Sequence, residues 1–152
     1  MTTESPNSNN DDRRAIHILA WAAQLALAVI FSFAGGFKAF TAPAALLAKA
    51  PDLASLPLPL VRFIGIAELA AAAGLILPAL TRIAPKLTPL AALCVMPILA
   101  GAFVINVREG HLASQFFVIV CTALAAFVAW ARLTQTPISP RNALSSAAPA
   151  GV

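Results

Sequence analysis

Charged residues divide the chain into four long apolar segments. The segments lie within the ranges Arg14–Lys38, Arg62–Arg82, Lys86–Arg108 and Glu109–Arg132. Each is about as long as the roughly 20 apolar residues that a helix needs to cross the hydrocarbon core of a bilayer. The pattern therefore predicts an all-α protein, a bundle of four transmembrane helices whose natural partner is the lipid bilayer.

The composition is that of a membrane protein and leaves little of the chain for a separate soluble domain. Hydrophobic residues make up 60% of the chain and charged residues only 11%, whereas a soluble domain carries about 25% charged residues. With four spans in 152 residues, function is expected inside the bundle and its short loops. The ten basic residues are scattered over segment ends instead of gathering on one face, so we expect no nucleic-acid partner.

The ends of the chain differ from its centre. Residues 1–12 are polar, and residues 134–152 are rich in Pro, Ser and Ala. Because they offer little patterned apolar surface to bury, both tails are expected to be disordered around a membrane domain at 13–133. The first apolar segment is longer than the 7–15 residues or so of a signal peptide's apolar region, which favours an uncleaved span over cleavage near Ala42.

The basic residues also predict an orientation. Six of them fall on the side of both termini and four on the other side, and the side richer in Lys and Arg usually faces the cytoplasm. We therefore expect both termini of this multi-pass protein to lie on the cytoplasmic side, and we take the membrane to be a bacterial-type cytoplasmic (inner) membrane. The six are Arg13, Arg14, Arg82, Lys86, Arg132 and Arg141.

The expected first helix, about 15–40, carries small and polar residues at intervals of three or four. This spacing puts them on one face, which should point into the bundle. The following connection, 41–60, contains four prolines and leaves room for a short helix at about 44–50, lying as a lid on the outer surface. The residues of the first helix's face are Gln24, Ala28, Ser32, Gly35 and Lys38.

Glu68 is the only acidic residue inside the four segments. A carboxylate within a span costs roughly 2.5–3.5 kcal/mol on insertion scales, so it needs a partner or a water-filled cavity. Arg62 lies on the same helix but points about 120° away from Glu68, so the two side chains cannot pair as residues four positions apart do. We expect Lys38 to face Glu68, with Arg62 nearer the outer surface. A structural ion pair, a functional carboxylate and a protonated, carbonyl-bonded Glu68 all remain open.

Polar residues are expected to converge on the outer half of the bundle, and no comparable cluster is expected on the inner half. The converging residues are Lys38, Arg62, Glu68, Asn106, Arg108, Glu109, His111 and Gln115. Glu68 is the best catalytic candidate, and His111 is either a solvated loop residue or a proton-exchanging group near neutral pH. Cys94 and Cys121 sit at different depths with no ligand cluster around them, so no metal site is expected. The candidate ligand-binding residues are Lys38, Arg62, Glu68, Asn106 and His111.

The segment LVRFIGIAELAAAAGLILP, residues 60–78, resembles the DoxX-like family of four-helix membrane proteins. It contains the family's R-x-x-G-x-x-E pattern followed by G-x-x-x-P, and Gly35 and Lys38 match a G-x-x-K pattern in the first helix. Family members often carry a histidine near the outer end of the third helix, where this chain has Asn106; His111 lies five residues further on. The matching second-helix positions are Arg62, Gly65, Glu68, Gly74 and Pro78.

The resemblance implies a quinone-linked membrane subunit, because the family takes its name from a subunit of an archaeal thiosulfate:quinone oxidoreductase and other members look like partners in redox or thiol-stress systems. Lys38 and Arg62 would then bind quinone oxygens, and Glu68 would orient or exchange a proton. No covalently bound cofactor is expected, and a separate protein would supply the redox chemistry. Assembly with further copies of the chain stays open.

Two other functions compete with the quinone-linked subunit. The first is a non-catalytic membrane interaction or scaffold protein whose buried charges are structural. The second is a carrier of protons or small molecules, for which four short spans form a small scaffold unless the protein oligomerises.

Overall fold

The computed structural model describes residues 8–84 and 86–135, and within them it contains helices and no strand. Four helices are long and apolar enough to cross a membrane: α1, α3, α4 and α5 with its extension η2. This confirms the predicted four-span bundle. The elements are α1 (Ser8–Phe40), α2 (Pro43–Lys49), the 3-10 helix η1 (Pro51–Ser55), α3 (Leu58–Thr81), α4 (Leu87–Glu109), α5 (Leu112–Trp130) and the π-helical turn η2 (Ala131–Gln135).

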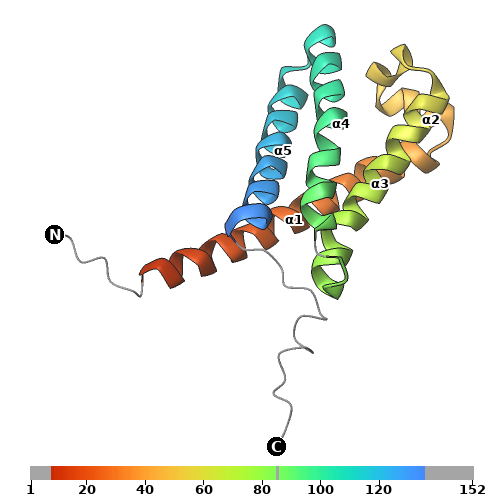
Figure 1. Ribbon diagram of the computed structural model, residues 1–152. Coiled ribbons are helices and arrows are strands. Elements are labelled where there is room, and N and C mark those ends of the chain that lie inside the picture. The colour runs from red at the N-terminus through yellow and green to blue at the C-terminus, as the bar shows by residue number, and fades with distance from the viewer. Residues whose placement is uncertain (1–7, 85, 136–152) are drawn as a thin grey trace, which may run out of the picture.

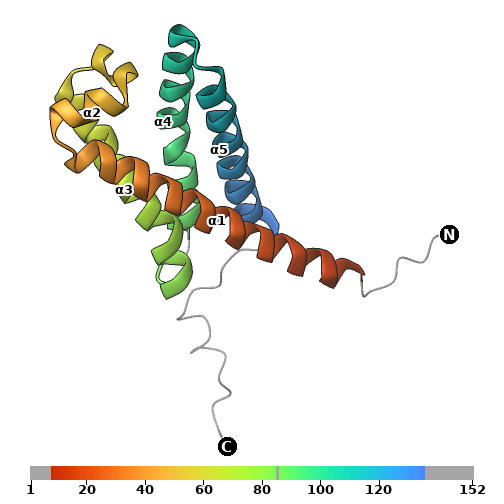
Figure 2. The same ribbon diagram turned by 180° about the vertical axis from the view of Figure 1, so that it is seen from behind.

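The four spans form two pairs. α1 packs mainly on α3, and α4 mainly on α5, while α3 also contacts α4 and α1 also contacts α5. α1 is steeply inclined to α4 and α5, as Figures 1 and 2 show from opposite sides. The end of the bundle that carries α2, η1 and the α4–α5 turn is called the α2 end below. At that end α3 and α4 diverge (Figure 1).

Two apolar clusters hold the helices together. The larger one lies among the four spans and includes Leu27, Phe31, Leu75 and Val95. The smaller one fixes α2 and η1 onto the α2 end; its buried members are Leu46, Leu53 and Val61. The short helix expected at 44–50 is therefore present, with bounds Pro43–Lys49. Its position relative to a membrane surface stays a prediction.

The terminal helices are longer than expected. α1 begins at Ser8 instead of near residue 15, so residues 8–12 of the expected polar tail continue the helix. Asp11 lies in its first turn, where a negative charge interacts favourably with the helix dipole. At the other end η2 reaches Gln135. The remainder of the two expected disordered tails, residues 1–7 and 136–152, lies outside the described residues.

The predicted inward face of α1 is correct except at one position. Gln24, Ala28 and Gly35 are buried, but Ser32 is exposed. At 100° per residue, Ser32 is rotated by about 80° from Gln24, whereas Phe31 is rotated by only about 20°. Phe31, 3% exposed, therefore occupies the inward position that Ser32 was expected to take.

The expectation that the half of the bundle away from α2 has no polar cluster is wrong. Arg132, only 4% exposed, donates from Nε and Nη2 to Oε1 of Gln24, with Nε 2.8 Å away. Gln24 in turn donates to the Leu75 carbonyl at 2.7 Å. Nη1 of Arg132 lies 3.2 Å from Nδ1 of His17, and its guanidinium carbon lies 5.3 Å from the centre of the Trp21 ring.

This cluster forms because Arg132 stands at the end of a span, where a long side chain can fold back along the bundle while its backbone stays near the end. Counting charges at span ends places Arg132 correctly along the chain but does not give the direction of its side chain. The guanidinium ties η2 to α1, and Gln24 extends the link to α3. We interpret the cluster as a structural clamp.

α1 and α3 touch through their backbones where Gly35 meets Gly65. A Cβ atom added to Gly35 would lie 2.7 Å from the Gly65 carbonyl oxygen. One added to Gly65 would lie 2.7 Å from the Ala39 nitrogen and 2.9 Å from Cβ of Lys38. Small residues permit such close approach between membrane helices. The crossing therefore depends on both glycines.

Replacing Gly65 or Gly35 with alanine should separate α1 from α3. The added methyl group would meet backbone atoms, which cannot rotate away, so we expect a loss of about 1–3 kcal/mol in the free energy of unfolding. Gly36→Ala is the matched control, because its Cβ would meet nothing within 4 Å. Thermal unfolding of the purified variants in one detergent measures the effect; equal midpoints for Gly35→Ala and Gly36→Ala would contradict the assignment.

Candidate functional site

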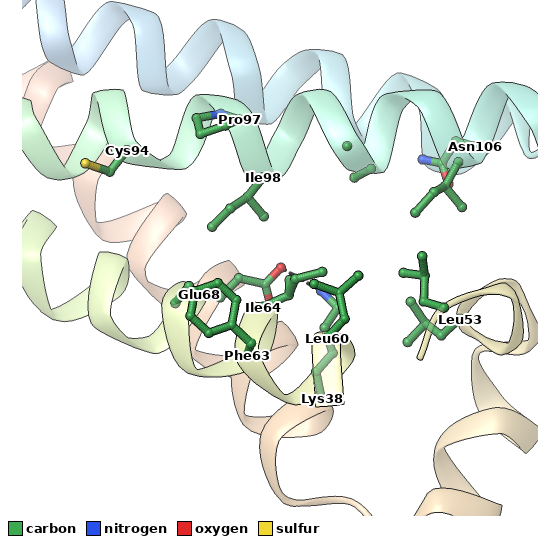
Figure 3. Close-up of a pocket in the computed structure, with 15 residues that line it drawn as sticks. Lys38, Leu53, Leu60, Phe63, Ile64, Glu68, Cys94, Pro97, Ile98 and Asn106 are labelled. Carbon is green, nitrogen blue, oxygen red and sulfur yellow. Dashed lines mark hydrogen bonds and ion pairs between the residues drawn. The ribbon is translucent and has the colours of Figure 1, made fainter. Parts of the chain in front are cut away.

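A cavity of about 600 Å³ lies between α3 and α4 at the α2 end of the bundle. Figure 3 shows the residues of α4 facing those of α3 across it, with Leu53 of η1 at one end. Most of the lining is apolar, and its chief polar groups are Lys38, Glu68 and Asn106. The other lining residues are Leu53, Leu56, Leu60, Phe63, Ile64, Ala67, Cys94, Pro97, Ile98, Gly101, Ala102 and Ile105.

The cavity exists because α3 and α4 meet closely only at their other ends. A Cβ atom on Gly74 would lie 2.9 Å from Cβ of Ala91, so the two helices are in tight contact there. Towards the α2 end they separate (Figure 1). Gly101 and Ala102 supply little side-chain volume on the α4 side, which leaves the space between the helices unfilled.

Lys38 and Glu68 form an ion pair beside this cavity. Nζ of Lys38 lies 2.6 Å from Oε1 of Glu68, and the side chains are 21% and 5% exposed, respectively. This confirms the prediction that Lys38 faces Glu68 inside the bundle. The glycine crossing explains the contact. Glu68 packs against Gly35, where an added Cβ atom would lie 3.0 Å from Cβ of Glu68, and Lys38 packs against Gly65 in the same way.

The second carboxylate oxygen of Glu68 has no such partner. Oε2 is buried, and no group in the described part of the chain donates a hydrogen bond to it. Figure 3 shows the carboxylate on the side of α3 that borders the cavity. Buried polar atoms in native proteins nearly always have a partner, so an orphaned carboxylate oxygen calls for an explanation.

Arg62, a candidate ligand-binding residue, makes its hydrogen bonds to the end of α1. Its Nη1 donates to the Lys38 carbonyl at 2.7 Å, and its Nη2 donates to the Thr41 carbonyl. Arg62 thus caps the C-terminus of α1, where unpaired carbonyls and the negative end of the helix dipole favour a cation. It lies nearer the α2 end than Glu68, as predicted, but it does not line the cavity.

The expected convergence of polar groups is only partly present. Asn106, 8% exposed, lines the cavity, and its carbonyl accepts the His111 amide at 3.0 Å. His111 itself precedes α5, is exposed and does not line the cavity. Arg108 and Glu109 are exposed too, and Gln115 of α5 is half-buried but does not line the cavity. Gly110, with φ of 72°, ends α4, and this turn directs the following residues away from the site.

Apart from Asn106, sequence reasoning missed the α4 side of the cavity. Its residues follow one helical face at intervals of three and four, as do those of α3 at 60, 63, 64, 67 and 68. Small residues and Pro97 on that face were the available signal, although periodicity alone does not separate a cavity wall from packed core. The lining residues of α4 are Cys94, Pro97, Ile98, Gly101, Ala102, Ile105 and Asn106.

The remaining reactive groups of the described chain do not form a second centre. No group of three or more His, Cys, Asp or Glu residues in the described ranges is arranged to hold a metal ion. Cys94 is an exposed free thiol on the cavity wall, whereas Cys121 is a buried one in the core. The cavity can therefore hold an apolar molecule, and its polar groups are the Lys38–Glu68 ion pair and, separately, Asn106 (Figure 3).

Removing the cation of the pair should destabilise the protein. Lys38→Met leaves the Glu68 charge buried without compensation, a change that costs about 3–5 kcal/mol for a fully buried pair. We expect the lower part of this range because Lys38 is 21% exposed.

Lys49→Met at an exposed position of α2 is the control and should change stability by less than about 0.5 kcal/mol. The double variant Lys38→Met/Glu68→Gln should recover much of the loss in thermal unfolding. If the double variant is as unstable as the sum of both single variants, the two side chains are not coupled.

Comparison with known proteins agrees with this architecture. The sequence profile of the DoxX-like family matches residues 22–129, a range that includes the Gly35–Gly65 crossing, the Lys38–Glu68 pair and every residue that lines the cavity. No curated protein and no solved structure shows significant similarity to the chain. The match covers well over half of the sequence, and the chain belongs to the DoxX-like family of membrane proteins.

Proposed function

We propose that the cavity between α3 and α4 binds a lipid-soluble molecule of the quinone type. In this proposal the chain is a membrane subunit of a redox or thiol-stress system in a bacterial-type cytoplasmic membrane, and a separate protein partner supplies the electrons. The observation that carries the proposal is the buried Oε2 of Glu68, which has no hydrogen-bond donor among the described residues and belongs to a side chain that lines an apolar cavity.

The energetics of Glu68 favour a binding role. An unsatisfied buried polar atom costs roughly 1–3 kcal/mol, and more when it is charged. A carboxylate that served only to fix helix register would be expected to satisfy both of its oxygens, as the buried guanidinium of Arg132 does with its own neighbours. A ligand that enters the cavity can offset the cost at Oε2.

The cavity suits a ligand that arrives through the bilayer. Its volume of about 600 Å³ falls within the roughly 300–1,000 Å³ of small-molecule sites. Two lining residues of α3, Leu60 and Phe63, are 43% and 68% exposed. Because α3 is long and apolar enough to span a membrane, this exposed apolar surface opens the cavity to lipid in the proposal. A quinone headgroup can therefore pass between α3 and α4 while its tail stays among the lipid chains.

The polar groups have separate roles in this site. Lys38 carries three donors, of which one is directed at Glu68, so the others are suited to a ligand oxygen. Glu68 can orient the headgroup and exchange protons with it. Asn106 lies about three turns from Cys94 along α4 and lines the part of the cavity nearer the α2 end. Arg62 acts indirectly, by holding the Lys38 carbonyl.

A non-catalytic scaffold is the second candidate function. The Gly35–Gly65 crossing and the Lys38–Glu68 pair both contribute to helix packing, as such a protein requires. This alternative predicts that every cavity variant loses its phenotype only in proportion to protein abundance. A variant with normal abundance and a lost phenotype would speak against it.

Filling the cavity should abolish binding without disturbing the fold. Gly101 lines the cavity, and a Cβ atom there meets nothing within 4 Å, so Gly101→Phe places a ring in the empty space. Gly36→Phe is the matched control, because its Cβ is equally unobstructed and it does not line the cavity. We expect quinone that co-purifies in native lipid, and affinity for added decylubiquinone, to fall at least tenfold only in Gly101→Phe.

The amount of co-purified quinone and the affinity for decylubiquinone are compared between the two variants once thermal unfolding has shown that they are equally stable. If wild-type protein carries no quinone and binds added decylubiquinone no better than Gly101→Phe, the proposed function is wrong. If Gly36→Phe loses binding equally, the ligand does not occupy this cavity.

A further inference from the structure

We infer that the cavity selects ligands that donate a hydrogen bond, and that it therefore binds a quinol, the dihydroxy form, more tightly than the corresponding quinone. This inference rests on the proposed function and specifies which redox form the site favours. It follows from the hydrogen bonds of the polar groups that line the cavity, because some of their atoms already have partners and Oε2 of Glu68 has none.

The first step concerns the charge of Glu68. Its Oε1 lies 2.6 Å from the ammonium nitrogen of Lys38, slightly shorter than the range of about 2.7–2.9 Å for a charge-assisted N–H···O hydrogen bond. We take Glu68 to be ionised in this pair with the Lys38 ammonium, and an ionised carboxylate only accepts hydrogen bonds. The remaining oxygen, Oε2, therefore needs a donor.

The second step concerns the donors nearby. Arg62, the other cation at this end of α3, donates to the carbonyls of Lys38 and Thr41 and does not line the cavity. Apart from Lys38 and Asn106, the lining consists of apolar residues, the Cys94 thiol and the carboxylate itself. In the described structure no protein donor reaches Oε2, so a ligand hydroxyl in the cavity can supply the missing hydrogen bond.

The third step compares the two ligand forms. A quinol has hydroxyl groups, and one of them can donate to Oε2 while the same oxygen accepts from Lys38. A quinone has carbonyl oxygens, which only accept. It can bind to Lys38, but its lone pairs would then lie beside the anionic Oε2, which stays unsatisfied. Asn106 does not discriminate, because its amide both donates and accepts.

Selective binding of the quinol has a redox consequence. When the reduced form binds more tightly, the bound couple is easier to reduce than the free couple. A tenfold preference corresponds to a rise of about 30 mV for a two-electron couple. Reduction of the bound quinone takes two electrons, which the proposed protein partner supplies, and two protons, one on each carbonyl oxygen. The site thus favours the direction in which a partner reduces quinone.

The test measures equilibrium binding of three ligands of similar size to the full-length protein in lipid nanodiscs under anaerobic conditions. The ligands are decylubiquinol, decylubiquinone and the dimethyl ether of decylubiquinol, which keeps the quinol's oxygens but has no hydroxyl hydrogen. We expect the quinol to bind at least tenfold more tightly than either of the others. Equal or tighter binding of the quinone or of the dimethyl ether would overturn the inference.

Two variants connect the selectivity to Glu68. Glu68→Gln replaces the anionic oxygen with an amide that can donate, so the preference for quinol over quinone should fall at least tenfold. Glu109→Gln, which removes the same charge at an exposed position, should keep the wild-type preference. A retained preference in folded Glu68→Gln would contradict the inference; if that variant does not fold, the three-ligand comparison on wild-type protein decides alone.

The outcomes also separate this inference from the proposed function. If none of the three ligands binds, or if Gly101→Phe does not weaken binding, the proposed function fails. If all three bind equally and Gly101→Phe weakens all of them, the cavity is a quinone site and only the selectivity is wrong.

Discussion

The backbone contact between Gly35 and Gly65 is the constraint on which the site depends. It brings α1 and α3 so close that Cβ of Lys38 lies against one glycine and Cβ of Glu68 against the other, and from these positions their charged ends meet at 2.6 Å. It also brings Arg62 to the C-terminal carbonyls of α1. A larger residue at either glycine would separate the helices, and the ion pair and the cap would both be lost.

The buried charges at the two ends of the bundle differ in their hydrogen-bond partners. Away from α2, Arg132 is surrounded by Gln24, His17 and the Trp21 ring, so its donors have acceptors within the described structure. At the α2 end, Glu68 has one oxygen paired and one without a donor. The first arrangement gives each guanidinium nitrogen a partner and stabilises the fold. The second leaves one oxygen that the proposed ligand would satisfy, which is why we propose the function there.

The sequence predicts the features that burial in a membrane constrains most strongly. Four spans follow from the lengths of the apolar segments, and Lys38 follows as the partner of Glu68 because few other cations lie within reach of a buried carboxylate. The cavity wall on α4 could not be predicted, because lipid-facing, packed and cavity-lining residues are all apolar. Hydropathy also does not encode where three other side chains lie. Ser32 is rotated out of the inward face of α1, the Arg132 side chain folds back along the bundle, and His111 follows the turn at Gly110 and lies outside the cavity.

Photoaffinity labelling tests the central claim most directly, namely that the cavity beside Lys38 and Glu68 is a ligand site. A quinone with a photoreactive group on its ring would be irradiated with the protein in native lipid, and the labelled peptides identified by mass spectrometry. The account predicts labels on the cavity faces of α3 and α4, around Ile64 and Ile98, that excess decylubiquinol suppresses. Labels spread over the lipid-facing surfaces of all four spans, unaffected by the competitor, would contradict it.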